Sequence, residues 1–303
     1  MEYREIPYRT KEEWLNIRKK GIGGSDAPAV CGLSPYRTPL QVYLEKVGQA
    51  NPPKDNRFME WGRILEPVVA GYFAKKTGLK LSPLKKVLVS KKHPFMLANI
   101  DRKISGSDEG LEIKTTGNRL NGQIPDDYLI QCYHYLAVTG WKRWHLAVLI
   151  GGNDFRHYVI ERDEEAISYL IEIERDFWKN HVAKKVPPEP CWMDAETMSQ
   201  LYPRSNGKVL RIKSNPELES LVQKFVELKE KEEALKKEKE EIANRIKSFM
   251  EECERIEFEH LPYRVCWKSH SSKKFDAKAF KQDHPDLYQS YLTLCKSRRF
   301  EVK

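Results

Sequence analysis

The chain has 303 residues and carries 53 Lys and Arg against 44 Asp and Glu, a formal net charge of +9 at pH 7. Its length and its hydrophobic content of 40% exclude collagen-like, mucin-like and disordered chains, and favour one domain with an appended element or two domains. No run reaches the roughly 20 apolar residues of a membrane span, the N-terminus has no apolar signal region, and the six cysteines form no CxxC pair. We therefore expect a cytosolic protein with reduced thiols that binds no membrane, and the basic balance is compatible with a polyanionic partner.

The first 190 residues alternate between helical and strand-like patterns. Apolar residues at helical spacing predict helices over 11–20, 26–31, 38–44, 58–77, 126–138 and 163–183. Short runs rich in branched residues predict strands over 86–90, 96–104, 111–115, 144–150 and 155–160. This order of elements indicates a mixed sheet covered by helices on both faces.

The remainder of the chain is patterned differently. Residues 187–216 are rich in Pro and weakly patterned, which indicates a boundary or a strap across the first domain. Beyond them, apolar residues at alternating steps of three and four predict a helix of roughly 35 residues, either a coiled coil or an arm packing on its own domain. The end of the chain predicts a strand over 264–267, a helix over 277–282 and a basic strand over 298–303. We therefore expect a domain over 1–190, a linker over 191–216 and an extension over 217–303.

The strand over 111–115 and the strand before it carry the residues that point to chemistry. Side chains alternate along a strand, so Glu112 and Lys114 project to the same face, and the preceding strand can place Asp101 beside them. Carboxylate oxygens suit Mg²⁺ or Mn²⁺, and the carbonyl of Ile113 can supply another oxygen. Two buried carboxylates oppose each other's ionisation, so we interpret the group as a metal site that activates water. The alternative is a surface strand with an ordinary Glu/Lys pair.

Asp101 followed by Glu112-Ile113-Lys114 resembles the signature of the PD-(D/E)xK nuclease superfamily, with Asn99-Ile-Asp101 where the superfamily name has Pro-Asp. Glu66, in Trp61-Gly-Arg-Ile-Leu-Glu66-Pro, resembles the upstream helix glutamate of the same site. Gln131-Cys-Tyr-His-Tyr135 resembles the Gln-x-x-x-Tyr motif of the RecB-like branch.

The opening Trp14-x3-Arg18-x6-Ser25, with its glycine-rich loop, is similar to the YqaJ-type viral recombinases, the family of phage lambda exonuclease. A guanidinium offers paired donors to phosphate oxygens, and free N–H groups at the start of a helix attract anions. Taken one at a time, these residues are better explained by packing, capping or solvation: Arg18 covers Trp14, and Ser25 caps a helix. The assignment therefore rests on five motifs in order over about residues 10–190.

The resemblance implies a three-layer α/β/α sandwich with a central mixed sheet, followed by the long-helix, coiled-coil-like α+β extension. It implies that Asp101, Glu112 and the Ile113 carbonyl bind Mg²⁺, with Mn²⁺ as the other candidate, and that Glu66 lies close enough to serve a second metal. Extended residue by residue, it makes Glu66, Lys114 and Gln131 the catalytic candidates.

The resemblance also assigns positions around the reacting groups. Lys114 and Gln131 are expected to orient the water, with Tyr135 supporting them, and Arg18 and Ser25 are expected to hold the 5′ phosphate of a DNA end. The implied activity is metal-dependent hydrolysis of DNA, in the form of a 5′→3′ exonuclease on double-stranded ends that leaves 3′ single-stranded tails for recombination.

The resemblance places this activity in the bacterial host cytosol, encoded by a phage or prophage. It adds a single-strand annealing protein as a partner and a homo-oligomer, a ring-shaped trimer, as the assembly. Two alternatives stay open: a structure-selective endonuclease on the same fold, and a non-catalytic DNA-binding or coiled-coil adaptor.

Overall fold

The computed structural model describes residues 2–50, 56–117, 120, 122–294 and 297–302, and the chain divides into two compact units, Met1–Met198 and Ser199–Lys303. The division falls inside the segment 191–216 that was expected to be a linker. Within the described ranges, no helix combines the length and the apolar character needed to cross a bilayer.

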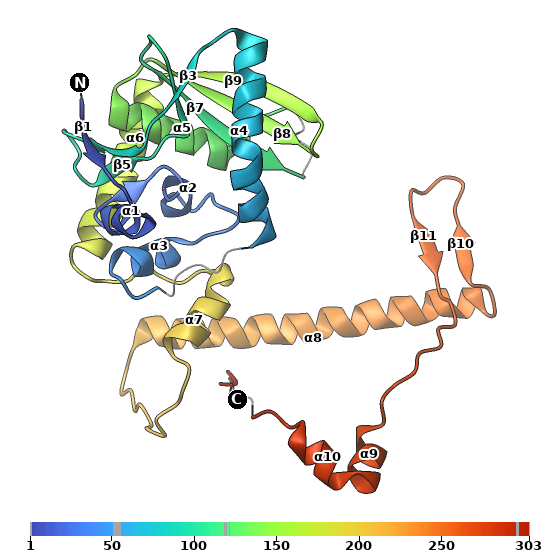
Figure 1. The fold of residues 1–303 in the computed structure, drawn as a ribbon. Coiled ribbons are helices and arrows are strands. Elements are labelled where there is room, and N and C mark those ends of the chain that lie inside the picture. The colour runs from blue at the N-terminus through green and yellow to red at the C-terminus, as the bar shows by residue number, and fades with distance from the viewer. Residues whose placement is uncertain (1, 51–55, 118–119, 121, 295–296, 303) are drawn as a thin grey trace. The chain divides into compact units, whose positions relative to one another are not determined.

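The helices of the first unit agree closely with the sequence pattern (Figure 1). They are α1 Lys11–Arg18, α2 Ala27–Val30, α3 Pro39–Lys46, α4 Arg57–Thr77, α5 Asp126–Thr139 and α6 Glu164–Asp176. The side chains of Thr10, Thr38 and Asn56 cap the first turns of α1, α3 and α4, and α4 and α5 end at left-handed glycines, Gly78 and Gly140. The helix expected to reach residue 183 continues past α6 as a π-helix, Phe177–Val182.

A further helical stretch lies where the sequence predicted none. The 3-10 helix Trp192–Asp194 leads into α7, Ala195–Leu201, inside the Pro-rich segment. Asp194 is buried, accepts a hydrogen bond from the Thr38 hydroxyl at 2.6 Å and accepts another from the backbone N–H of Cys191 at 2.8 Å. Thr38 and Asp194 are 156 residues apart in the sequence, so their hydrogen bond, which holds this turn, leaves no local pattern in the sequence.

The strands of the first unit form two sheets, so the expectation of one central sheet is wrong. The first sheet has the order β1 Tyr3–Pro7, β4 Lys86–Ser90, β5 Met96–Ala98 and β2 Ile22–Gly23. The second has the order β3 Leu81–Pro83, β6 Arg102–Ile104, β7 Glu109–Thr116, β8 Arg143–Ile150 and β9 Asp154–Glu161. In the second sheet β7 and β8 are parallel and the other pairs antiparallel, so the sheet is mixed.

The strand expected over 96–104 breaks at residues 99–101, which puts β5 and β6 in different sheets. The side chain of Asn99 accepts a hydrogen bond from the Trp14 indole at 3.1 Å, and its carbonyl accepts one from the Tyr135 hydroxyl at 3.1 Å. The carboxylate of Asp101 accepts the N–H of Ile113 at 2.8 Å. Two side chains and one backbone N–H from outside the strand therefore bind the polar groups of residues 99–101, and the strand ends there.

Helices cover both faces of the five-stranded sheet. Alternate side chains of β8 point to opposite faces and pack in two different cores. Trp144, Leu146 and Val148 pack with α5 and α6, whereas Ala147 and Leu149 pack with Phe73 and its neighbours on α4. Figure 1 shows α4 running across the sheet. The site residues expected on β7 and α5 therefore face a helix-covered interior.

The second unit is built around one long helix. It contains α8 Pro216–Met250, β10 Arg255–Glu257, β11 Arg264–Cys266, α9 Ala277–Asp283 and α10 Pro285–Ser290. The 35 residues of α8 agree with the predicted length. The basic strand expected over 298–303 is absent from the described residues 298–302, which have no regular structure, and residue 303 lies outside the described residues.

Gly110 of β7 provides a test of this packing. A Cβ there would lie 2.4 Å from ring atoms of Trp144, which is fully buried, so Gly110→Ala must displace the ring. We expect a loss of about 1 to 3 kcal/mol in the free energy of unfolding, measured by urea denaturation. Gly71→Ala on α4 is the control, because a Cβ there meets nothing within 4 Å and alanine favours the helix by up to about 1 kcal/mol. Equal stabilities for the two variants would contradict the packing described.

Candidate active site

Asp101 and Glu112 face each other because of the register between β6 and β7. Arg102 pairs with Leu111 in that antiparallel ladder, so the next residue in each direction, Asp101 and Glu112, also lie opposite one another. The ladder ends there, and Asp101 Oδ2 accepts the freed N–H of Ile113 at 2.8 Å. The register thus places one carboxylate on each of two neighbouring strands.

A chain of hydrogen bonds joins Glu112 to Lys114 and to helix α5. Lys114 Nζ lies 2.8 Å from Glu112 Oε1 and donates to Gln131 Oε1 at 2.7 Å. The Gln131 amide nitrogen donates to Glu112 Oε1 at 2.7 Å and lies 2.8 Å from the Tyr135 hydroxyl. The structure therefore brings Asp101, Glu112, Lys114, Gln131 and Tyr135 together in one cluster, hereafter the carboxylate cluster.

The carboxylate cluster is strongly polarised. Burial raises the pKa of Asp101 well above its usual range, and the nearby carboxylates of Glu112 and Glu66 raise it further. Burial on its own lowers the pKa of the Lys114 ammonium, but the carboxylates of Glu112 and Asp101 outweigh burial and the net shift is upward. At Asp101, burial and the neighbouring carboxylates thus outweigh the Lys114 ammonium.

Glu66 reaches the carboxylate cluster from α4 but is bound by a residue that the sequence did not single out. Arg102 Nη1 lies 2.6 Å from Glu66 Oε1 and donates to the carbonyl of Asp101 at 2.6 Å. Arg102 directly follows Asp101 in the sequence. Its position next to an expected carboxylate was the signal that could have identified it as part of the site. In the structure Glu66 is an ion-pair partner, and its part as a ligand to a second metal stays a prediction.

Arg18 and Ser25 also lie together. Both Nη atoms of Arg18 lie within hydrogen-bond distance of the Ser25 hydroxyl, at 3.4 and 3.5 Å, and the guanidinium is 5.1 Å from the centre of the Trp14 ring. Ser25 is exposed, whereas the Arg18 side chain is largely buried. The covering of Trp14 and the contact with Ser25 therefore coexist.

Asp26 organises this corner, and sequence analysis missed it. Asp26 is fully buried, and its carboxylate accepts from Arg18 at 2.9 Å, Arg37 at 2.7 Å, Lys46 at 2.6 Å and the N–H of Gly23 at 3.0 Å. Burial raises its pKa, but the three cations outweigh burial and hold the pKa well below its usual range. The residue occupies the N-cap position of α2, yet its side chain makes no capping bond. The cations lie 8, 11 and 20 residues away, which leaves no local pattern to recognise.

The glycine-rich loop joins the two groups of charges. A Cβ on Gly24 would lie 2.4 Å from the Tyr135 ring, so the loop backbone rests directly on the residue that also contacts Gln131. Only glycine permits this approach. Arg18, Ser25 and Asp26 are thereby fixed next to the carboxylate cluster.

The chemistry of the cluster fits a divalent cation. Glu112 is buried, and its Oε2 has no hydrogen-bond partner among the described residues. A cation between Asp101 and Glu112 would bind that oxygen and offset the repulsion between the carboxylates. Across the described residues, no three His, Cys, Asp or Glu side chains are grouped so that they could hold a metal ion. The Ile113 carbonyl and water would therefore have to complete the ligand set.

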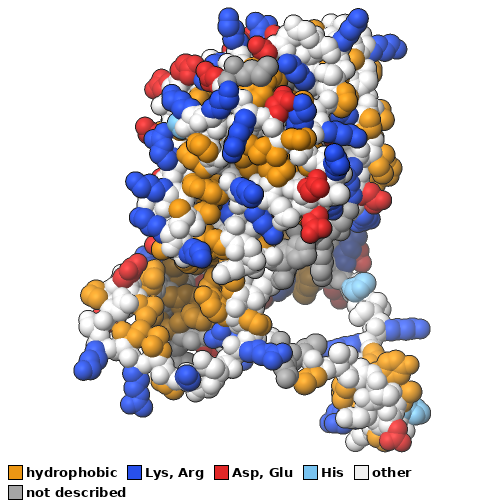
Figure 2. All heavy atoms as spheres, turned by 60° about the vertical axis from the view of Figure 1, so that its left-hand side comes forward, with side chains coloured by type: hydrophobic (Ala, Val, Ile, Leu, Met, Phe, Trp, Pro, Cys, Tyr) orange, Lys and Arg blue, Asp and Glu red, His pale blue; other side chains and the backbone are white. Residues whose placement is uncertain are grey.

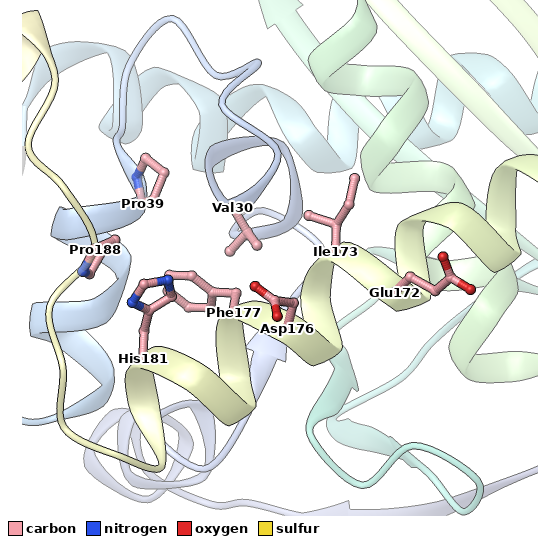
Figure 3. Close-up of a pocket in the computed structure, with 8 residues that line it drawn as sticks. All are labelled: Val30, Pro39, Glu172, Ile173, Asp176, Phe177, His181 and Pro188. Carbon is pink, nitrogen blue, oxygen red and sulfur yellow. The ribbon is translucent and has the colours of Figure 1, made fainter.

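The cavity drawn in Figure 3 lies elsewhere in the first unit. It has a volume of about 470 Å³ and is lined by Val30, Pro39, Glu172, Ile173, Asp176, Phe177, His181 and Pro188. None of these is a predicted site residue. The candidate site is accordingly defined by its side-chain contacts.

Comparison with known proteins places these residues in context. Residues 13–174, which include every predicted site residue, match the family model of the YqaJ-like viral recombinase domain. The protein YqaJ of Bacillus subtilis (strain 168) is 33% identical over 309 aligned residues, covering 97% of this chain and 94% of that protein. Among solved structures, an alkaline exonuclease (LHK-Exo) from Laribacter hongkongensis has a TM-score of 0.49 and 17% identity, covering 58% of this chain and 94% of that one.

Asp26→Asn tests the electrostatic role of Asp26. Removing one member of a buried charge cluster typically costs about 3 to 5 kcal/mol in the free energy of unfolding, and we expect that loss at pH 7. Because the folded-state pKa is lowered, the carboxylate stabilises the fold above the ordinary pKa of about 3.9, and this contribution is lost as the pH falls toward the folded-state value.

Urea denaturation at pH 7 and at several pH values below 4 measures both effects, and the difference between the two proteins should shrink on acidification. Asp108→Asn is the control, because Asp108 is exposed and its ion pair with Lys103, at 3.8 Å, is long. A constant difference between wild type and Asp26→Asn across the whole pH range would rule out the charge explanation.

Proposed function

Because the chain belongs to the YqaJ-like viral recombinase domain family, we propose that it is a metal-dependent deoxyribonuclease that degrades double-stranded DNA from its ends. The observation that carries this proposal is the carboxylate cluster, in which Gln131 bridges Lys114 and Glu112 beside Asp101. Its residues are those that the PD-(D/E)xK resemblance assigns to phosphodiester hydrolysis.

Asp101, Glu112 and the Ile113 carbonyl would hold Mg²⁺, with Mn²⁺ as a substitute. The ion supplies Lewis-acid polarisation of the phosphate and a lowered pKa for water. The Lys114 ammonium, fixed by Glu112 and Gln131, is a donor that can orient the attacking water. Tyr135 keeps the Gln131 amide in place, so the two residues act as one positioning unit.

Arg18 and Ser25 would hold the 5′ phosphate of the DNA end. The guanidinium donates to anionic oxygens in pairs, and the hydroxyl lies beside it on an exposed loop. Glycine contact between this loop and Tyr135 keeps the phosphate position next to the carboxylate cluster. Degradation that begins at a 5′ phosphate leaves a 3′ single strand, the product that recombination by annealing requires.

The charge of the protein suits this substrate. The chain carries a net charge of +9, and Figure 2 shows Lys and Arg side chains spread over the face in view, with Asp and Glu in smaller groups. Cations that neutralise phosphates release counterions, so DNA binding should weaken with salt. A ring-shaped homotrimer, a single-strand annealing protein as partner, and action in the bacterial cytosol on behalf of a phage or prophage complete the proposal, by family resemblance.

Lys114→Ala tests the catalytic assignment. With Mg²⁺ and linear duplex DNA labelled at either end, we expect wild-type protein to release label from the 5′ end and the variant to lose about 10³-fold or more in rate. Asp101→Asn and Glu112→Gln should behave in the same way, and a chelator should stop the wild-type protein. Lys80→Ala removes an exposed lysine next to Ser105, at the end of β6 away from Asp101, and should keep wild-type activity.

The same experiment separates the alternatives. Cleavage of a circular duplex without ends would identify a structure-selective endonuclease. Binding of DNA without cleavage of any substrate, in Mg²⁺ or Mn²⁺, would identify a non-catalytic adaptor and overturn the proposal. Wild-type activity in Lys114→Ala would show that the assigned cluster is not the active site.

Arg18→Lys tests the phosphate site. The change keeps a positive charge beside Asp26 but removes the paired donors, so the preference for a 5′-phosphorylated end over a 5′-hydroxyl end should fall about tenfold. The ratio of initial rates on the two duplexes measures this preference without depending on the amount of active protein. Arg4→Lys, on an exposed position of β1, should leave the ratio unchanged. An unchanged ratio in Arg18→Lys would exclude Arg18 from the phosphate site.

A further inference from the structure

Helix α8 carries an apolar stripe that faces solvent. The stripe consists of the positions reached by alternating steps of three and four residues from Leu218 to Phe249, and we call it the α8 stripe. Five of its members are between 43% and 65% exposed: Leu221, Phe225, Leu228, Leu235 and Ile242. Large apolar side chains repeated along a helix of about 50 Å mark a surface that is covered by another helix.

Two charged residues interrupt the α8 stripe, and their signs differ. Glu232 and Lys239 occupy stripe positions seven residues apart, so they are equivalent positions in successive heptads. In a parallel pair of identical helices, each would face its own copy, Glu against Glu and Lys against Lys. Like charges in the seam of a coiled coil oppose association, so the sequence disfavours the parallel arrangement.

An antiparallel pair reduces this conflict. Centred between Glu233 and Ala234, it sets Leu218 opposite Phe249 of the second copy, and every stripe position within α8 receives a partner. Leu228 then lies opposite Lys239 of the second copy, and Glu232 lies opposite its Leu235. Consecutive layers are about 5 Å apart along the axis. Each Glu232 therefore has Lys239 of the other copy in one adjacent layer and Glu232 of the other copy in the next, which gives two contacts of opposite charge against one of like charge.

We propose that α8 associates with α8 of a second copy of this chain in this antiparallel register, with Glu232 and Lys239 setting the orientation. The pairing has two-fold symmetry, and α8 lies outside the first unit, which holds the candidate active site. The pairing therefore joins two chains, or two rings if the first units form rings. In the single chain, the Phe300 ring contacts Phe225 edge-on, with centroids 5.5 Å apart. The second copy would take the place of that ring on the stripe.

Charge reversal in the full-length chain tests the proposal. Sedimentation velocity over a range of protein concentrations measures the dissociation constant of the pairing. Glu232→Lys, which gives four lysines in the seam, should raise this constant about tenfold or more, and Lys239→Glu should do the same. The double variant Glu232→Lys with Lys239→Glu restores opposite charges and should return the constant to within about threefold of wild type.

The matched control is Glu233→Lys, which changes the net charge equally from an exposed position next to the stripe. It should sediment as wild type does, and circular dichroism should give equal helix content for all variants. Three results would overturn the proposal. The first is a wild-type mass that halves neither on dilution nor in Glu232→Lys. The second is a single reversal that does not weaken association, as expected for a parallel pair, and the third is a double variant that stays dissociated. An unchanged mass would leave the C-terminal segment as the occupant of the stripe.

Discussion

The mutual repulsion of two buried carboxylates is the constraint on which the candidate site depends. The register between β6 and β7 forces Asp101 and Glu112 together, and burial raises the pKa of Asp101 well above its usual range. The surrounding polar contacts offset that cost: Ile113 donates its N–H to Asp101, and Lys114 and Gln131 both contact Glu112. Even the break between β5 and β6 belongs to this arrangement, because it frees Asp101 from a ladder and turns it toward the neighbouring strand.

A second buried charge cluster has the opposite balance. Around Asp26, the three cations Arg18, Arg37 and Lys46 meet two carboxylates, those of Asp26 and Glu45. The other group consists of the carboxylate cluster with Glu66 and Arg102 beside it. In it, the three carboxyl groups of Asp101, Glu112 and Glu66 meet two cations, Lys114 and Arg102. With every carboxyl group ionised, the formal charge of the group around Asp26 is +1 and that of the other group is −1. Contact between Gly24 and Tyr135 keeps the two groups adjacent. The site therefore has a positive side at Arg18 and a negative side at Glu112.

Sequence patterns predicted what depends on neighbours along the chain and missed what depends on distant contacts. The helices α4 and α5 were predictable because their apolar spacing and their terminal glycines are local signals. The gathering of Glu112, Lys114 and Asp101 was predictable because strand alternation and antiparallel pairing are regular. The division into two sheets, the turn held by Asp194 and the cations around Asp26 were not, since each depends on partners far along the sequence. Arg102 is the exception, a local signal that was available and was overlooked.

Under the proposed function, the opposite balances of the two clusters would let one small region bind both a metal ion and a phosphate. A cation would stabilise the ionised forms of Asp101 and Glu112, whereas the guanidinium groups of Arg18 and Arg37 favour an anion. In that case, replacing either group by apolar residues would remove this selectivity, although such a replacement often costs the fold nothing. Under the proposed function, the 5′ phosphate of a DNA end would bind at Arg18 and Ser25, and the scissile phosphate would bind at the carboxylate cluster. The buried charges are then retained for the substrate they select and not for the stability they add.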